Sequence, residues 1–335
     1  MTRGPSRREA LALCALAPFR VRAASAPSTL LVAPPSAPTH DPGPGEPDRP
    51  ERLAAVASAL ADNRFRAALR AEAPAASLEA LLRVHEPAYL AKIEAATPKQ
   101  GLAQFAPDVV MSTGTYEAAL RAAGGAVLAV ESVMRGGAKN AFVATRPPGH
   151  HALPGVAMGF CFFNNAAIAV RHAMSVCGAE RIAIIDFDVH HGNGVQRIFW
   201  DDKNVLYCST HQMPLYPGTG AASETGAFDN IVNAPLVKGD GSEAFREAFN
   251  ARILPRLDAF GADIIILCAG FDAHLHDPLG GLRLVETDFR DVTLRIMEIA
   301  ARRCGSRVVS LLEGGYKPDD LANSVVAHVG ALMEV

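Results

Sequence analysis

The stretch that decides the fold reads Arg181-Ile-Ala-Ile-Ile-Asp186-Phe-Asp-Val-His190-His-Gly-Asn-Gly194. Its apolar first half is typical of a strand buried on both faces of a parallel sheet. Its second half places acidic and histidine side chains directly at the end of that strand. Every second residue of an extended chain faces the same side, so we expect Asp186, Asp188 and His190 to point together. Two carboxylates and an imidazole on one face favour a bound cation, and zinc accepts such ligands.

Around this stretch, helical and strand patterns alternate along the chain. Short apolar runs predict strands at residues 141–146, 181–186, 205–209, 263–269 and 307–312. Helical patterns cover residues 113–134, 165–176, 242–260 and 285–303, with a short helix after the strand at 181–186. No internal repeat or linker divides the pattern. We therefore expect a single three-layer α/β/α domain with a mainly parallel central sheet.

The segment before the first predicted helix is rich in proline. The prolines of residues 27–50 predict an irregular stretch on the surface. Pro50 suits the first turn of a helix, which we expect to end near Asp62.

The first 26 residues resemble a twin-arginine export signal. Arg7 and Arg8 precede a short apolar run, and small residues follow at 23–26. The alternative is a disordered tail, and residues 27–335 form the main domain in both cases. The protein is expected to be periplasmic if the signal functions and cytoplasmic otherwise.

Composition narrows the classes of function. With 49% hydrophobic and 20% charged residues, the 335-residue chain is expected to fold around a substantial core. The net charge is −3 and lysine and arginine are not concentrated beyond residue 22, so we expect no nucleic-acid partner. No apolar run of about 18 residues predicts a membrane span. The six cysteines are scattered, without the paired spacing of a zinc ribbon or a redox motif.

Polar side chains also follow three other predicted strands. His150 and His151 follow Pro-Pro-Gly at 147–149, Asp272 follows the strand at 263–269, and Tyr316 ends Glu-Gly-Gly-Tyr at 313–316. Ligands of parallel sheets bind at the carboxyl ends of the strands, so these side chains are expected to meet. An imidazole titrates near neutral pH, and a tyrosine hydroxyl can stabilise an oxyanion. Taken singly, each of these residues would be read as an ordinary helix cap, loop residue or packing residue.

Taken together, these motifs resemble the histone deacetylase superfamily from about Pro47 to Tyr316. The shared segments are Arg-Pro-Glu-Arg at 49–52, Pro-Pro-Gly-His-His at 147–151, Gly-Phe-Cys-Phe-Phe-Asn-Asn at 159–165, the Asp-His run at 186–194, Pro-Gly-Thr-Gly at 217–220, Gly-Phe-Asp-Ala at 270–273, Asp-Pro-Leu-Gly-Gly at 277–281 and Glu-Gly-Gly-Tyr at 313–316. Asn193 and the Gly-Phe-Asp-Ala form are similar to the class II branch and its bacterial relatives, including acetylpolyamine amidohydrolases. The resemblance implies the arginase/deacetylase-like α/β fold.

The resemblance also implies a set of site residues. It implies one zinc ion per chain, held by Asp188, His190 and Asp272, with ferrous iron as the alternative. Asp186 would bond to His150, and Asn193 would orient His151, with Tyr316 stabilising the oxyanion. A structural potassium ion would use Asp186, Asp188, His190 and Ser209. An acyl-lysine channel would be lined by Gly159, Phe160, Tyr216 and Leu279. Tyr216 departs from the family's usual phenylalanine.

Three more positions follow from the same resemblance. Arg52 matches an arginine beneath the site that is associated with the acetate-release channel. Asp108 lies in a loop that resembles the family's substrate-binding loop. Asp108 and Glu46 are candidates for acidic groups at the rim that would favour a cationic substrate.

The expected activity is removal of an acetyl or other acyl group from an N-acylated amine. An acetyl-lysine peptide, an acetylpolyamine and a small acylated amine all suit a narrow channel. One alternative is an acyl-binding protein without catalysis on the same fold. Another is an arginase-type ureohydrolase with two manganese ions, but that chemistry requires Asp-x-His-x-Asp, and the last position here is Gly192.

Overall fold

The computed structural model of the chain describes Met1, residues 28–34 and residues 40–334. The export signal or tail expected at residues 1–26 therefore lies outside the described residues, apart from Met1. Within the described chain, no helix combines the length and apolar character needed to cross a bilayer.

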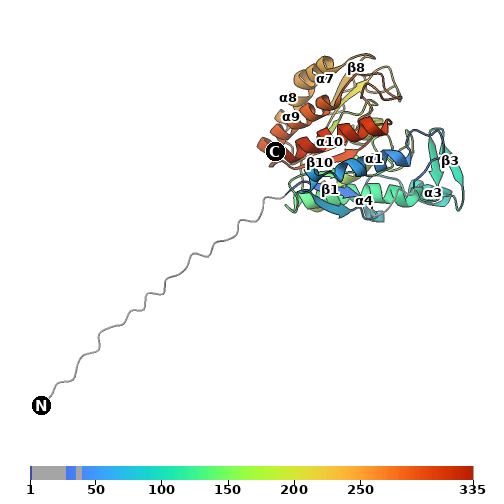
Figure 1. The fold of residues 1–335 in the computed structure, drawn as a ribbon, viewed down its shortest axis with the longest axis horizontal. Helices are drawn as coiled ribbons and strands as arrows, with labels where there is room; N and C mark the ends of the chain where they lie inside the picture. Colours follow the sequence, from blue (N-terminus) through green and yellow to red (C-terminus); the bar gives the residue numbers. More distant parts are fainter. Residues whose placement is uncertain (2–27, 35–39, 335) are drawn as a thin grey trace.

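A parallel sheet forms the centre of the described chain (Figure 1). Its eight described strands lie in the order β2-β1-β5-β10-β9-β6-β7-β8, and every neighbouring pair is parallel. The strands are β1 Leu30–Ala33, β2 Leu69–Glu72, β5 Ala141–Val143, β6 Ile182–Asp186, β7 Val205–Gln212, β8 Ile231–Leu236, β9 Ile264–Ala269 and β10 Val308–Leu312. The prediction of a mainly parallel sheet is confirmed.

Helices cover both faces of this sheet. One face packs against α1 Pro50–Leu60, α7 Ser242–Ala248, α8 Leu254–Phe260, α9 Glu286–Cys304 and α10 Pro318–Glu334. The other packs against α4 Thr115–Met134, α5 Asn165–Cys177 and α6 Asn193–Phe199. Along β6, Ile182 and Ile184 join one core and Ala183 and Ile185 join the other. Because both faces are buried, β6 reads as a continuous apolar run, and the predicted three-layer architecture is confirmed.

A smaller unit packs beside α4. It contains α2 Leu78–Leu82, α3 Pro87–Ala96 and the antiparallel hairpin of β3 Leu102–Ala106 and β4 Val109–Ser112, and η1 Asn63–Phe65 precedes it. Tyr89, Ile93, Met111 and Phe162 belong to its apolar core. Figure 1 shows α3 and β3 together at one end of the molecule. This unit carries Asp108 in the hairpin turn.

One local expectation was wrong, and one helix that the structure confirms contains an irregular turn. Residues 27–50 were expected to be irregular, but Leu30–Ala33 form the buried strand β1, which pairs with both β2 and β5. Its run of four apolar residues is short, and the surrounding prolines dominate the local pattern. The helix expected at 242–260 changes geometry at the π-helical turn η2 Phe249–Ile253. Pro255, two residues after the end of η2, has no N–H for an ordinary helical hydrogen bond, so a wider turn suits this position.

The strand order brings the polar motifs together. β5, β10, β9 and β6 are consecutive neighbours in the sheet, although they are far apart in sequence. The four polar segments of the sequence follow these four strands, so they meet at one edge of the sheet. The prediction that α1 starts at Pro50 is also confirmed, and α1 packs beside α10, to which the sequence patterns assigned no helix.

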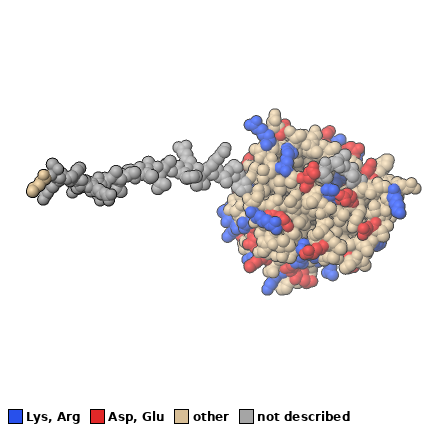
Figure 2. Space-filling model, turned by 90° about the horizontal axis from the view of Figure 1, so that it is seen from below, with Lys and Arg blue, Asp and Glu red and all other residues tan. Residues whose placement is uncertain are grey.

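Charges are mixed on the face seen in Figure 2. Lysine and arginine side chains alternate with aspartate and glutamate side chains, and no broad basic area covers the described residues on that face. Such a surface lacks the basic stripe that is typical of nucleic-acid binding.

His328 generates a prediction about stability and pH. Its Nδ1 and Nε2 lie 2.6 Å and 2.8 Å from the hydroxyl oxygens of Thr293 and Ser310. Burial lowers the pKa of His328 to about 3. A histidine in the unfolded chain has a pKa of about 6.5, so between about pH 3 and pH 6.5 the unfolded form binds a proton that the folded form does not bind. The contribution of His328 to the free energy of unfolding is therefore complete above about pH 6.5. It is lost as the pH falls from about 6.5 towards 3.

We expect His328→Asn to flatten the pH dependence of unfolding. Between pH 6 and pH 4, the free energy of unfolding of the unmodified chain should fall more steeply than that of the variant, by up to about 1.4 kcal/mol per pH unit. Urea denaturation at a series of pH values measures this difference. Parallel profiles for the two proteins would contradict the prediction.

Candidate active site

Three potential metal ligands converge at the carboxyl ends of β6 and β9. The His190 Nδ1 atom lies 3.1 Å from Asp188 Oδ1 and 3.1 Å from Asp272 Oδ2. One ligand atom from each of the three residues lies within 4.8 Å of the others, and all three residues are buried. Backbone N–H groups fix the carboxylates, since Gly314 donates to Asp188 Oδ2 and Val189 donates to Asp272 Oδ1, both at 2.8 Å.

Glycine is required where the backbone approaches these carboxylates. A Cβ atom on Gly270 would lie 2.0 Å from Asp188 Oδ2, and one on Gly314 would lie 2.0 Å from Asp272 Oδ2. The ends of β9 and β10 therefore wrap closely around the carboxylates, which leaves no room for a larger residue.

The cluster concentrates negative charge in the interior. Burial and the neighbouring Asp188 carboxylate raise the pKa of Asp272 to about 7. Burial removes the hydration of both carboxylates, and their negative charges repel each other. A cation between them offsets both effects.

Asp186 is not part of this three-residue cluster, although Phe187 and Val189 pack into the same core as Ala183 and Ile185, which keeps Asp186, Asp188 and His190 on the opposite side of the chain. The strand ends at Asp186, and the chain then turns by side-chain to backbone bonds. Asp188 N–H donates to Asp186 Oδ1 at 3.2 Å, and His190 N–H donates to Asp188 Oδ1 at 2.8 Å. Such local bonds replace the strand ladder beyond Asp186.

Asp186 instead contacts the histidine pair. Its Oδ2 lies 3.1 Å from His150 Nδ1, and His151 Nδ1 lies 2.9 Å from Asn193 Oδ1. An acceptor at each Nδ1 implies that a proton sits there. The two rings are 4.0 Å apart. The structure thus pairs His150 with Asp186 and His151 with Asn193, as the resemblance implied.

The two histidines differ in their electrostatic surroundings. Burial opposes charge on His150, but the carboxylates of Asp188 and Asp186 outweigh it and raise its pKa to about 10. Burial, with repulsion from His150 and His190, holds the pKa of His151 well below its ordinary value. The surroundings thus favour the charged form of His150 and the neutral form of His151.

Glu313 holds the backbone of the histidine pair. Its Oε2 accepts the N–H groups of Gly149 at 2.7 Å and His150 at 3.2 Å. Burial raises the pKa of Glu313 to about 7. The Glu-Gly-Gly-Tyr motif contained this residue, but a carboxylate next to glycines reads locally as part of a turn, so its role was missed.

Tyr316 lies over a buried arginine. The Arg52 guanidinium is 4.7 Å from the centre of the Tyr316 ring, and its Nε and Nη2 donate to the carbonyls of Gly315 and Glu313, both at 2.5 Å. Tyr316 N–H donates to Asp277 Oδ2 at 2.7 Å. Arg52 also bonds to the buried Asp48. Arg52 thus lies beneath the site, in the position that the resemblance implied.

A cavity of about 250 Å³ leads to the cluster. It is lined by Asp108, His151, Gly159, Phe160, His190, Leu215, Tyr216, Leu279 and Tyr316. The four predicted channel residues and Asp108 are among them, and Leu215 is added. Glu46 does not line this cavity. It lines a separate small cavity next to Phe160. Gly159 has φ +56, and a Cβ there would lie 2.3 Å from His151 Cδ2.

Tyr216 and Asp108 are joined across the cavity. The Tyr216 hydroxyl donates to Asp108 Oδ2 at 2.7 Å, and the same oxygen accepts Gly159 N–H at 2.8 Å. The hydroxyl that distinguishes Tyr216 from phenylalanine therefore has a partner in the β3–β4 turn.

Ser209 lies beside Asp186 as its register partner on β7. Its Oγ is 2.9 Å from His211 Nδ1, and both Ser209 and Asp186 are fully buried. Gly192, the position that an arginase-type site would fill with aspartate, has no space for it. A Cβ there would lie 2.3 Å from Asp186 Oδ2.

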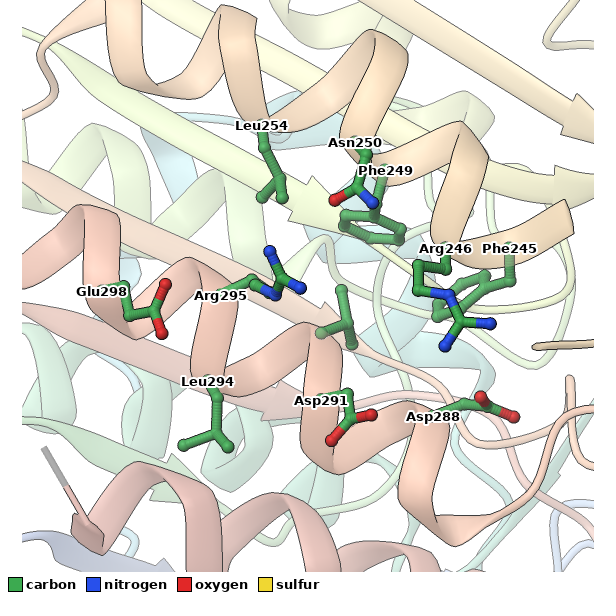
Figure 3. A pocket seen from close by; sticks show the side chains of 11 residues that line it. Phe245, Arg246, Phe249, Asn250, Leu254, Asp288, Asp291, Leu294, Arg295 and Glu298 are labelled. Carbon is green, nitrogen blue, oxygen red and sulfur yellow. The ribbon is translucent and has the colours of Figure 1, made fainter. Parts of the chain in front are cut away.

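A second cavity, of about 240 Å³, lies elsewhere in the fold (Figure 3). It is formed by α7, η2, α8 and α9, with Phe245 and Phe249 among its apolar lining. Its exposed rim carries charges of both signs, including Arg295 and Asp291. None of the predicted site residues lines it.

Tyr207 was also missed, because a tyrosine inside an apolar strand reads as a core residue. Its hydroxyl donates to Asp186 Oδ2 at 3.0 Å and accepts Gly192 N–H at 3.1 Å.

We expect Tyr207→Phe to remove one hydrogen bond from Asp186 Oδ2 and one from the Gly192 N–H, and to lower the free energy of unfolding by about 1–3 kcal/mol.

Tyr89→Phe is the matched control for this experiment. The buried Tyr89 hydroxyl has one partner, the Phe162 carbonyl at 2.7 Å. Urea denaturation should show a larger loss for Tyr207→Phe than for Tyr89→Phe. Equal losses would mean that the contacts with Asp186 and Gly192 contribute nothing beyond an ordinary buried hydroxyl.

Comparison with known proteins identifies the family. Residues 46–332 match the histone deacetylase domain. A probable deacetylase of Archaeoglobus fulgidus is 40% identical over 283 residues, covering 83% of this chain and 78% of that protein. A histone deacetylase-like amidohydrolase of Pseudomonas aeruginosa is 39% identical over 289 residues, covering 85% and 74%. The crystal structure of the HDA15 HD domain superposes with a TM-score of 0.86 at 34% identity, covering 92% of this chain and 88% of that one. The chain therefore belongs to the histone deacetylase family.

Proposed function

We propose that the protein is a zinc-dependent deacetylase that hydrolyses the amide of an N-acylated amine. One observation carries the proposal, namely that a narrow channel ends at a buried Asp188–His190–Asp272 cluster flanked by a histidine pair and a tyrosine. The names of the archaeal and bacterial relatives support the reaction class.

The three residues fit a zinc ion. Zinc bonds of about 2.0–2.2 Å in tetrahedral geometry place neighbouring ligand atoms about 3.3–3.5 Å apart. The 3.1 Å separations of His190 Nδ1 from the two carboxylates are close to this spacing. Three protein ligands with a position left open are typical of catalytic sites. One zinc ion per chain, held here, would polarise the amide carbonyl and lower the pKa of a water molecule.

His151 would move the protons. Its Nδ1 is committed to Asn193 and its ring lines the channel, so Nε2 is the atom that would take a proton from the attacking water. The same atom would return a proton to the departing amine. His150, charged and bonded to Asp186, would tune this step electrostatically.

Tyr316 would stabilise the oxyanion of the tetrahedral intermediate. Burial raises its pKa well above the ordinary value, so the hydroxyl keeps the proton that it has to donate. The bonds from Asp277 and Arg52 to its loop hold it in the channel wall.

A potassium ion beside Asp186 and Ser209 is the second ion that we propose. Burial raises the pKa of Asp186, and the nearby Asp188 carboxylate adds to this effect. A monovalent cation next to these oxygens would offset the charge without taking part in the reaction.

The channel suits an extended, unbranched acyl-amine. Phe160 and Tyr216 supply aromatic walls, and the carboxylate of Asp108 lies at the rim. An acetyl-lysine peptide, an acetylpolyamine and a small acylated amine share the features that this channel would recognise.

Acetate release from zinc-loaded protein tests the reaction. We expect activity on an acetyl-lysine peptide or on acetylated polyamines, and the better substrate identifies the class. Asp188→Ala should abolish activity together with zinc binding at this site. Activity that survives Asp188→Ala would refute the metal-dependent reaction.

Tyr316→Phe tests the oxyanion role. Turnover should fall about 100-fold or more, the usual effect of removing one oxyanion donor, while the zinc content stays unchanged. Turnover at the level of the unmodified chain would exclude this role.

Tyr216→Phe tests the contact across the channel. The ring wall remains, but Asp108 loses a hydrogen bond worth about 1 kcal/mol, so we expect KM to rise about fivefold with kcat unchanged. Tyr216→Leu, which also removes the ring, should lower kcat/KM further. A fall in kcat at constant KM for Tyr216→Phe would show that the hydroxyl acts in the reaction itself.

A further inference from the structure

A second group of metal-ligating side chains lies outside the proposed active site. It consists of His274 and His276, in the segment after β9, and Asp320, in the first turn of α10. Among the described residues, this group and the Asp188–His190–Asp272 cluster are the ones in which three such side chains bring ligand atoms within 4.8 Å of one another. The proposed reaction uses none of its three residues.

The geometry of the group suits a small divalent cation. His276 Nδ1 lies 3.3 Å from Asp320 Oδ2, the spacing of about 3.3 Å that two ligands of a tetrahedral zinc ion adopt. His274 is buried, and its Nδ1 lies 3.3 Å from the backbone nitrogen of His276, a long contact that zinc would replace at this atom. His276 and Asp320 reach solvent, with 58% and 18% of their side chains exposed, so an ion could enter.

The chemistry of the ligands selects the kind of ion. Two imidazoles and one carboxylate suit zinc and neighbouring transition metals, whereas calcium and magnesium prefer oxygen ligands throughout. Glu286 lies near the group, with its Oε2 3.8 Å from His274 Nε2, and adds negative charge.

We propose that His274, His276 and Asp320 form a second zinc-binding site. Zinc there would link the segment after β9 to the start of α10. Both elements adjoin the proposed active site, since Asp277 in that segment accepts Tyr316 N–H at 2.7 Å and α10 begins at Pro318. The second ion would therefore hold in place the loop that carries Tyr316. This proposal does not rest on the proposed reaction, because none of the three residues belongs to the Asp188–His190–Asp272 cluster.

Zinc stoichiometry tests the proposal. Tag-free full-length chain is stripped of metal and titrated with Zn²⁺ by calorimetry, beside Asp188→Ala, His276→Ala and the double variant. We expect two zinc ions per chain in the unmodified protein, one in each single variant and none in the double variant. Zinc should also raise the melting temperature of Asp188→Ala but not that of the double variant.

His172→Ala is the matched control. His172 Nε2 lies 2.9 Å from Glu131 Oε1, a histidine–carboxylate pair that belongs to neither three-residue group. The His172→Ala variant should still bind two zinc ions per chain. Zinc binding that His276→Ala does not change would overturn the second site and leave the active-site proposal intact. Zinc binding that Asp188→Ala does not change would count against the active site instead.

Discussion

Two carboxylates buried side by side, those of Asp188 and Asp272, set the constraint on which the rest of the site depends. Desolvation makes their joint charge costly unless a cation or several donors offset it. The surrounding chain supplies those donors from its backbone, through Gly314 and Val189. It also supplies glycines where a Cβ would collide with the carboxylate oxygens. The shape of the strand ends follows from this need.

The same constraint continues into the layer beneath. Asp48, fully buried, is balanced by Arg52 and Arg146, and these two arginines outweigh the effect of burial to hold the pKa of Asp48 well below its ordinary value. Arg52 then donates to the carbonyls of Gly315 and Glu313 and packs on Tyr316. A charge network thus joins α1 to the loop after β10. Removing one member would leave a buried partner uncompensated, which is why such networks are costly to break.

Rigid support of this kind explains how loops can carry a precise site. The histidine pair follows β5, the proposed ligands follow β6 and β9, and the tyrosine follows β10, so each loop that carries them starts from a strand buried on both faces. Glu313 joins the loop after β10 to the loop after β5, and Tyr207 of β7 bonds to Asp186 at the end of β6. Positions fixed from two sides leave little freedom for reorganisation during a reaction.

The sequence by itself determined the class of fold and predicted which polar side chains would meet at the strand ends. Apolar runs such as Ile264–Ala269 predicted buried parallel strands, and the polar motifs after them predicted a site at the strand ends. Only the tertiary structure decided the strand order, with β9 between β6 and β10. It alone showed the Tyr216–Asp108 contact and the His274–His276–Asp320 group. Periodicity reports the burial of a residue along its own element, whereas these contacts join elements distant in sequence and depend on how the whole chain packs.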